Sequence, residues 1–357
     1  MHWYLLGIIA ATLLINHLFI HFGFVNLTYR MEIARKVYEI GEDIEISSIV
    51  ENDKPLTVSF LEVHERFPES FKVKSNIYTL FVRPFQRVRR TYKVAARKRG
   101  LHAIEHVHLR LGDFIGLKSD QRYLQVDQEV IVLPEKANLK ESLVPVGALT
   151  GAVSVQRWIV DDPLMTIGIR EYTGTEPQRF IHWPSSLRHN QLMVKKFDFT
   201  TDNSAMVILN METMKPCWKP VEEDIIERAI SLTRGVFEEL EEKRIPYGFA
   251  TNAYNDSLQR KGYFYHPGLG QRHLAAFLEI LGKIHYRVPS FFELTLRDIR
   301  KIRGNFTTAV IITPRILESY IQPINLLSRS LSRTVVIAVE GEHLAALNSS
   351  IIKYGGR

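Results

Sequence analysis

The side chains best suited to binding chemistry gather in one short stretch, residues 168–197. Arginine and lysine can clamp a carboxylate or a phosphate, and an indole ring can stack on a guanidinium. The stretch supplies these groups, together with imidazole and hydroxyl groups, at Arg170, Tyr172, Arg179, His182, Trp183, Ser185, Arg188 and Lys195. Either the set binds an anionic ligand or an acidic peptide, or, as we favour, it pins a connector to the domains on either side.

A hydrolytic site is a further interpretation of the same stretch. His182 could act as a base for Ser185 or Ser186, but the sequence shows no nucleophile elbow, no oxyanion loop and no third group to orient the imidazole. Gly268 and Gly270 precede an expected helix, but no strand leads into them as a phosphate loop requires. We therefore predict no catalytic residue, no cofactor and no enzyme activity.

The length, net charge and cysteine count limit the class of protein. A chain of 357 residues is long for one domain, which favours two domains and an anchor. The net charge of +7 permits attraction to anionic surfaces without requiring nucleic acid. Cys217 is the only cysteine, which excludes an intrachain disulfide. The oligomeric state stays open.

The first element that the sequence predicts is a membrane anchor over residues 1–27. Residues 3–25 contain no Asp, Glu, Lys or Arg, and as a helix they would reach about 35 Å. Arg30, Arg35 and Lys36 follow the run closely, whereas basic residues are almost absent before it. The positive-inside rule then predicts a single-pass protein of the cell membrane with the bulk of the chain in the cytoplasm.

Residues 28–135 show short alternating strands with turn signals, and predict an immunoglobulin-like β-sandwich. Residues 83–99 contain eight basic residues and no acidic one. In a strand, Arg87, Arg89 and Lys93 share one face. This face either rests on anionic lipid headgroups or is an ordinary solvated face.

Residues 136–200 are expected to form a connector, and residues 201–357 an α/β domain. Apolar runs suited to buried strands occupy residues 205–211, 307–313 and 334–340, and a further strand is expected over 246–253. Residues 222–243 have the apolar stripe of an amphipathic helix, which Pro246 stops. This alternation predicts a doubly wound, mostly parallel sheet. The expected fold class is multi-domain α+β: a transmembrane helix, a sandwich and an α/β domain.

Several motifs make the chain resemble the domain of unknown function 58 family. The sequence LGDFIGL at 111–117 is followed by an R-x-Y pair, an R-x-I-H-W centre, a Ser-x-x-Arg step and an L-x-V-K-x-F end, at Arg170–Tyr172, Arg179–Trp183, Ser185–Arg188 and Leu192–Phe197. Two features depart from the family pattern. Gly174-Thr175 stands where members have Gly-Asp, and members usually carry two N-terminal spans where this chain shows one.

The resemblance implies that residues 201–357 are similar to a von Willebrand factor type A domain. Such domains often bind a divalent ion through a D-x-S-x-S motif after the first strand. Asn210, Glu212 and Met214 stand at those positions, so an amide and a thioether replace two oxygen ligands that a hard cation prefers. We therefore predict a degenerate site without a functional metal.

The family also implies a partner, an AAA+ ATPase of the MoxR type. The function we expect is a membrane-anchored cytoplasmic interaction and assembly factor that works with such an ATPase. The alternative is a binding module for anionic ligands such as a lipid headgroup or a phosphate or glycan precursor. A hydrolase that uses His182 is the third interpretation.

Overall fold

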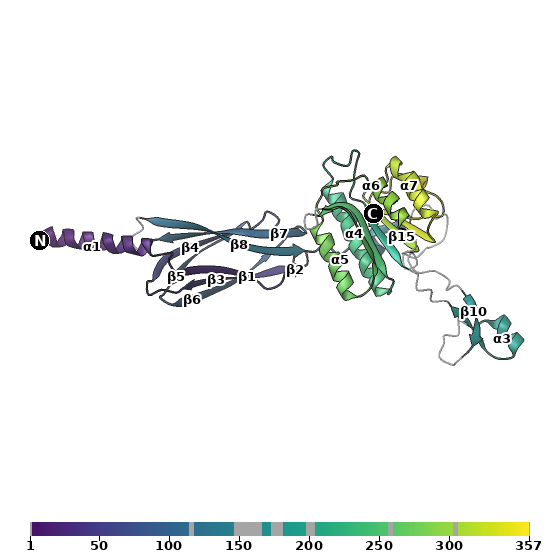
Figure 1. Ribbon diagram of the computed structural model, residues 1–357, viewed down its shortest axis with the longest axis horizontal. Coiled ribbons are helices and arrows are strands. Elements are labelled where there is room, and N and C mark those ends of the chain that lie inside the picture. Colours follow the sequence, from purple (N-terminus) through teal and green to yellow (C-terminus); the bar gives the residue numbers. More distant parts are fainter. Residues whose placement is uncertain are drawn as a thin grey trace. The chain divides into compact units, whose positions relative to one another are not determined.

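The computed structural model describes residues 2–113, 118–145, 166–172, 181–197, 204–255, 260–302 and 306–356. The chain divides into two compact units, one formed by Met1–Glu135 with Leu278–Ile284 and the other by the remainder (Figure 1). Both units are built on β-sheets.

The first helix, α1 (His2–His21), is where the predicted fold class is wrong. None of the helices within the described ranges is both long enough and apolar enough to cross a membrane, so the predicted transmembrane anchor is withdrawn. The end of the apolar run belongs instead to the fold of the first unit. Asn16 is buried and donates a 2.6 Å hydrogen bond to Asp113, Phe24 joins the core, and Lys54 donates to the carbonyls of Gly23 and Val25.

Two sheets with a shared core follow α1, and their strands pair antiparallel except for β2, which runs parallel to β8. The smaller sheet has the order β1 (Leu27–Ile33), β3 (Asp43–Asn52) and β6 (Gln86–Ala95). The larger sheet has the order β2 (Val37–Tyr38), β8 (Ser119–Val132), β7 (Gly100–Gly112), β4 (Val58–Arg66) and β5 (Ser75–Val82). Alternate residues, such as Ile44 and Ile46, point into one core to which strands of both sheets contribute. The period-2 pattern in the sequence indicates this packing because successive side chains of a strand lie on opposite faces.

A buried carboxylate lies inside this apolar core. Glu65 on β4 is fully buried and accepts hydrogen bonds from five side chains, which come from both sheets: Tyr29, Ser48, Asn76, Tyr78 and Tyr92. Burial, and then the charge of Glu65, raise the pKa of each of the three tyrosines, so their hydroxyl groups remain donors. We call this group the Glu65 cluster; it links β1, β3 and β6 to β4 and β5.

The second unit contains a seven-stranded sheet. Its order is β14 (Arg260–Gly268), β13 (Tyr247–Asn255), β12 (Ala205–Leu209), β15 (Thr308–Thr313), β16 (Arg333–Ala338), β17 (Ile352–Gly356) and β9 (Leu143–Pro145). The strands from β13 to β17 run parallel, and β14 and β9 are antiparallel edges. The chain leaves β12 to form β13 on one side and β15 on the other, so the carboxyl end of β12 is a topological switch point.

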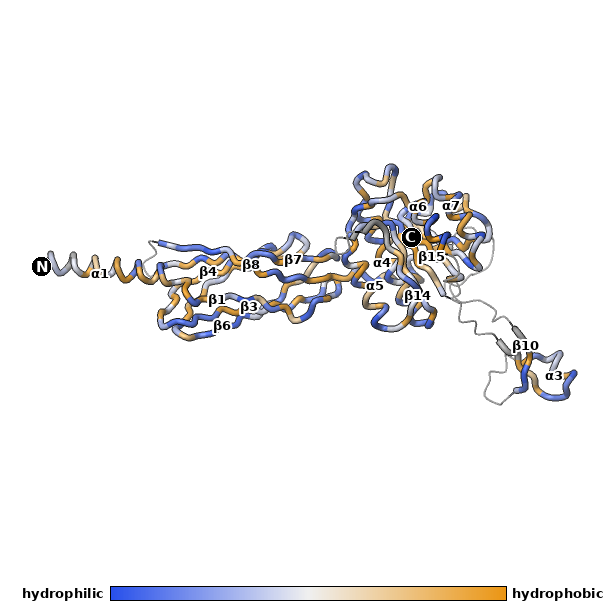
Figure 2. The backbone as a smooth tube through the Cα atoms, viewed as in Figure 1, coloured by the Kyte–Doolittle hydropathy of each residue, from blue (hydrophilic) through white to orange (hydrophobic). Residues whose placement is uncertain are grey.

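Helices cover both faces of this sheet. α4 (Glu223–Glu242) lies on one face, and α6 (Phe292–Lys301) and α7 (Glu318–Ser328) lie on the other (Figure 1). α5 (Gln271–Lys283) follows β14, which ends at Gly268, so the expectation that no strand leads into Gly268 and Gly270 is wrong. α2 (Leu139–Ser142) precedes β9. Each residue of β12 is buried, which explains why its sequence is uniformly apolar; the stretch labelled β15 is likewise orange in Figure 2.

Residues 136–200, expected to be only a connector, supply regular structure as well. β9 joins the large sheet by pairing with β17. β10 (Thr166–Glu171) and β11 (Met193–Phe197) form a separate two-stranded antiparallel sheet, and α3 (Trp183–His189) lies between them in the sequence. We call β10, α3 and β11 the α3 module.

Candidate functional site

The α3 module contains most of the site residues that the sequence predicts. His182 precedes α3 as its N-cap, Pro184 stands in the first turn, and Asn190 ends the helix in the left-handed conformation with φ 51°. Proline is favourable at a helix start because the N–H that it lacks would have no intrahelical partner there, and asparagine is favourable at a left-handed cap because it tolerates a positive φ. Ile181 forms a bridge to Val194, which attaches the start of α3 to β11.

His182 and Ser185 meet, but in a capping arrangement. The Nδ1 atom of His182 lies 2.8 Å from Ser185 Oγ and accepts a 3.3 Å hydrogen bond from the Ser185 backbone N–H. Ser186 Oγ donates to the His182 carbonyl and accepts from the Met193 N–H. Both serines are buried. These bonds satisfy backbone groups of the turn, so the geometry favours a structural use of the His/Ser pair.

The outward side of α3 carries large apolar side chains. Trp183 is 60% exposed and Leu187, one helical turn later, is 82% exposed. Residues four apart lie on the same face of a helix, so the two form one surface, which we call the α3 patch. Ile169 on β10 and Leu192 before β11 are exposed as well. Leu187 is not among the residues that the sequence predicts for the site, although its spacing of four residues from Trp183 was the available signal.

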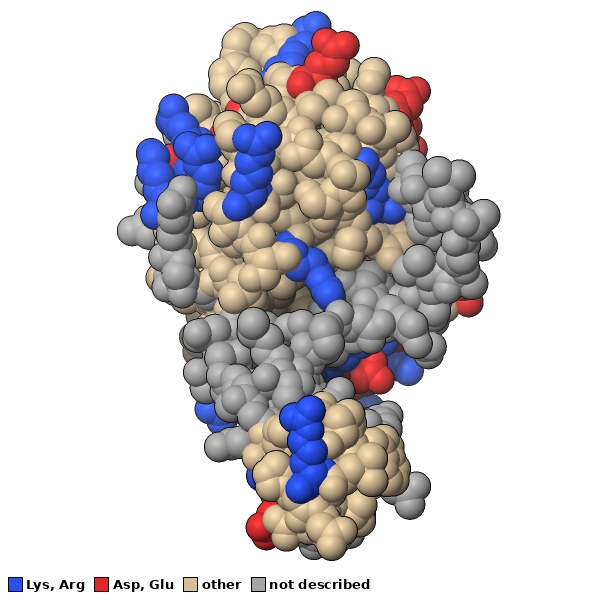
Figure 3. Space-filling model, turned by 90° about the vertical axis from the view of Figure 1, so that its right-hand side faces the viewer, with Lys and Arg blue, Asp and Glu red and all other residues tan. Residues whose placement is uncertain are grey.

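The structure brings only part of the predicted set together. Arg170 and Arg188 are exposed, Tyr172 and His182 are half-buried, and Ser185 is buried, so these side chains do not converge on one enclosed ligand site. Lys195 lies on β11 opposite Ile169. Arg179 lies outside the described residues. In Figure 3 the lowest described part, which belongs to this module, is largely uncharged, with basic side chains and an acidic one on it.

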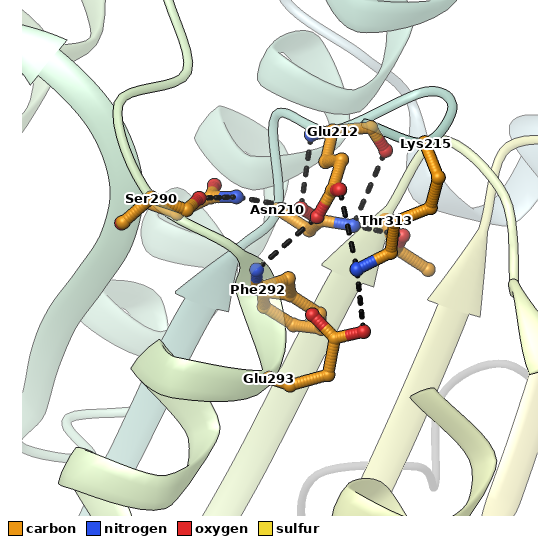
Figure 4. Close-up of polar contacts among 8 residues, drawn as sticks. Asn210, Glu212, Lys215, Ser290, Phe292, Glu293 and Thr313 are labelled. Atoms are coloured by element: carbon orange, nitrogen blue, oxygen red, sulfur yellow. Dashed lines mark hydrogen bonds and ion pairs between the residues drawn. The ribbon is translucent and has the colours of Figure 1, made fainter. Parts of the chain in front are cut away.

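A second candidate lies at the carboxyl end of β12, where the sequence pointed to a degenerate metal site (Figure 4). Asn210 donates to Thr313 Oγ1 at 2.9 Å, and its Oδ1 accepts from the Glu212 N–H and from Asn252. Glu212 is buried, and its Oε2 accepts a 3.1 Å hydrogen bond from the Phe292 N–H at the start of α6. A helix N-terminus favours such a carboxylate.

A cation of the protein itself stands at this position. The Nζ atom of Lys215 lies 2.5 Å from Glu293 Oε1 and 3.4 Å from Glu212 Oε1. It also lies 4.6 Å from the ring centroid of Phe291 and 5.3 Å from that of Tyr320. We call Asn210, Glu212, Lys215, Glu293 and Thr313 the β12-end cluster. Half-buried Met214 contributes no hard ligand, and the described ranges contain no set of three His, Cys, Asp or Glu side chains placed to hold a metal ion. The expectation of no functional metal stays a prediction.

The basic strand is β6, the edge of the smaller sheet, with Arg87, Arg89 and Lys93 exposed on one face. Acidic residues lie close to all three. Arg89 pairs with Glu32 at 3.2 Å, Lys93 lies 4.0 Å from Asp43, and the register places Arg87 opposite Glu51. These neighbours favour the solvated-face interpretation because they offset part of the positive charge. Contact with a lipid surface stays a prediction.

Comparison with known proteins yields little. No family model and no curated protein matches this chain. A CARDB domain from Pyrococcus furiosus in complex with di-metal ions is 12% identical over 30% of this chain and 91% of its own, with a TM-score of 0.22. The DNA glycosylase AlkC of Pseudomonas fluorescens, bound to abasic-site DNA, is 14% identical over 28% of this chain and 31% of its own, with a TM-score of 0.19.

A β-glucosidase from Listeria innocua in complex with gluconolactone is 10% identical over 29% of this chain and 17% of its own, with a TM-score of 0.17. This chain therefore spans less than two thirds of the glycosylase and of the glucosidase. At these TM-scores, none of the likenesses supports a conclusion about fold or function.

Proposed function

We propose that this chain is a protein-interaction factor and that the α3 patch is its contact surface. The observation that carries the proposal is the exposure of Trp183 and Leu187, side by side on a seven-residue helix. Leaving two such side chains in water forgoes a burial free energy of roughly 1.5–3 kcal/mol each. A partner that covers them recovers this free energy on binding.

The surroundings of the patch indicate the chemistry of the partner. Arg188 follows Leu187 on α3, and Arg170 is exposed on β10. Tryptophan and arginine are the side chains that most often dominate protein–protein binding. The surface therefore suits a partner with an apolar pocket and an acidic rim. From the family resemblance, we propose a MoxR-type AAA+ ATPase as this partner, and no bond-making step for the chain itself.

The hydrogen bonds around His182 support the same proposal. They fix the start of α3, and so the direction of Trp183, through Ser185, Ser186 and Met193. A preorganised contact residue loses less entropy on binding than a mobile one. In this account His182 is a positioning residue.

An anionic surface is the second candidate, because an exposed indole beside an arginine also suits the headgroup region of a lipid bilayer. The two candidates differ in their response to salt. Apolar contact with a protein pocket weakens little as ionic strength rises, whereas attraction to a charged surface is screened.

Calorimetry measures the Kd of the full chain for a purified MoxR-type ATPase from the same organism. The wild type is compared with the variants Trp183→Ala and Leu187→Ala. Trp218→Ala is the matched control, since Trp218 is an exposed tryptophan elsewhere in the second unit. We expect each α3 variant to raise Kd about tenfold or more and the control to leave it unchanged. A second arm uses vesicles of anionic lipid at low and high salt.

The outcomes separate the two candidates. Binding to the ATPase that depends on Trp183 supports the interaction factor. Salt-sensitive binding to vesicles without binding to the ATPase supports the second candidate instead. Binding in which Trp183→Ala and Trp218→Ala behave alike would remove the α3 patch from either role.

A further inference from the structure

Strand β5 is an open edge. In the part of the chain that the structure describes, it pairs with β4 and with no other strand. Its sequence, SNIYTLFV, contains no charged residue, no proline and no glycine. An edge strand presents a row of backbone N–H and C=O groups that can pair with another chain, and proteins usually block it with charge, proline, a bulge or short length. β5 has eight residues and a sequence that carries no blocking side chain.

Other edges of the same unit are blocked. β6, the edge of the smaller sheet, carries Arg87, Arg89, Arg90 and Lys93, so two copies of β6 would repel each other. β2, at the far edge of the larger sheet, is only two residues long. β1, the other edge of the smaller sheet, carries exposed Arg30 and Glu32. Among these four edges, β5 is the one that is both longer than two residues and free of charged side chains, so it is the edge at which this unit can accept a strand.

The outward face of β5 is apolar. Ile77 and Phe81 are each 56% exposed, and exposed Thr79 lies between them on the same face. Phe60 on the neighbouring strand β4 is exposed as well, within the irregular part of the β4–β5 pairing. Exposed apolar groups next to an open edge mark a surface that gains free energy when it is covered.

We propose that a second copy of this chain pairs antiparallel with β5 across a two-fold axis at Thr79, joining two five-stranded sheets. Directly opposite residues in an antiparallel pair point to the same face. In this register Thr79 stands opposite Thr79 of the second copy, and Ile77 stands opposite Phe81. Each outward apolar residue meets another, and no like-charged pair forms within the strand, so a second copy is the occupant that the sequence of β5 fits.

The small buried area of this contact limits the affinity of the dimer. One strand pair of eight residues buries less surface than a permanent dimer interface, so the dimer depends on protein concentration. Lys74 and Arg83 flank the strand, and the antiparallel register brings Lys74 of one copy near Arg83 of the other. Salt screens this repulsion. The dimer therefore strengthens from low to moderate ionic strength.

The test uses cysteine variants of the full chain. Opposite residues lie about 4.5–5.5 Å apart at Cβ, close to the distance that a disulfide spans. Thr79→Cys should give a covalent dimer under mild oxidation, and Ile77→Cys mixed with Phe81→Cys should do so while neither forms one alone. The native Cys217 is buried. Tyr123→Cys, at an exposed site on β8, is the control for random collision and face-to-face stacking.

Sedimentation measures the dimer Kd and is the second test. Thr79→Lys places two ammonium groups opposite each other, and we expect it to raise the dimer Kd about fivefold or more. The proposal is overturned if the full chain stays monomeric up to about 100 µM at moderate salt. It is also overturned if Thr79→Cys crosslinks no faster than Tyr123→Cys, or if Ile77→Cys alone crosslinks as well as the mixture.

Discussion

Two buried glutamates, one in each unit, show how differently a protein can surround a charge. Glu65 is 0% exposed and Glu212 is 1% exposed. The carboxylate of Glu65 takes five side-chain hydrogen bonds and has no lysine or arginine among those donors. The carboxylate of Glu212 has one backbone hydrogen bond, from Phe292, and a 3.4 Å contact with Lys215.

The difference lies in how each charge is compensated. A buried charge is tolerated when its hydrogen-bonding capacity is filled, as at Glu65. At the end of β12, Glu212 Oε1 contacts Lys215 Nζ at 3.4 Å, and Thr213 Oγ1 is buried with no hydrogen-bond partner among the described residues. The carboxylate of Glu65 is thus held by neutral hydrogen-bond donors, whereas that of Glu212 depends on one lysine to compensate its charge.

The largest expected effect is the loss of Glu65. Glu65→Ala leaves three tyrosine hydroxyls, a serine and an asparagine in the core without their acceptor, and we expect a loss of about 3–5 kcal/mol in unfolding free energy. Urea unfolding measures it. Glu62→Ala, on the opposite face of β4 and half-buried, is the matched control and should change stability by less than about 0.5 kcal/mol. Equal effects of the two variants would contradict a structural role for the Glu65 cluster.

The second-largest expected effect comes from removing the cation that contacts Glu212. Lys215→Met leaves the buried Glu212 carboxylate without its cation, and we expect a loss of about 2 kcal/mol. In the double variant Glu212→Gln with Lys215→Met the fully buried uncompensated charge is gone and only the partly exposed Glu293 lacks its cation, so stability should return part of the way toward that of the wild type. A double-mutant cycle by urea unfolding gives the coupling. Additive losses would show that Lys215 does not compensate Glu212.

The third prediction concerns pH. Burial raises the pKa of the Glu293 carboxyl, but the hydrogen bonds from Lys215, Ser319 and the backbone, together with the charge of Lys215, outweigh this, so the pKa lies below its ordinary value of 4.5. A carboxyl whose pKa falls on folding stabilises the protein above the unfolded-state pKa and loses that contribution as pH falls through the folded-state pKa. The stability difference between wild type and Lys215→Met should therefore be full at pH 7 and shrink below about pH 4.5.

Urea unfolding of both proteins between pH 7 and pH 3 measures this difference. A difference between wild type and Lys215→Met that stays constant down to pH 3 would mean that Lys215 acts through packing on Phe291 and Tyr320, not through charge.

The smallest expected effect lies outside both clusters. His182→Ala removes the side-chain cap of α3, and we expect a local loss of about 1 kcal/mol, while His182→Asn keeps a capping oxygen and most of the stability. Amide exchange of the α3 backbone measures it. Protection that is unchanged in His182→Ala would contradict the positioning role, and with it the preorganisation of Trp183.

The sequence predicted those parts of the fold in which the pattern is local. The apolar runs at 205–211, 307–313 and 334–340 coincide with β12, β15 and β16, and the stripe over 222–243 coincides with α4. A buried parallel strand must be apolar on both faces, and a helix on a sheet must be apolar on one side. β9 and β17 were not predicted, because each is short and gains its stability from a partner distant in the sequence.

The sequence by itself determined which charged and aromatic groups are present, since Arg170, Trp183 and Arg188 keep their guanidinium and indole groups in any fold. Only the tertiary structure decided their use. Trp183 and Leu187 face solvent while Ser185 turns inward, Asn16 finds Asp113 ninety-seven residues away, and five distant donors meet at Glu65. The physical reason is that local periodicity fixes the type of an element, whereas exposure and hydrogen-bond partners depend on which distant segments pack against it.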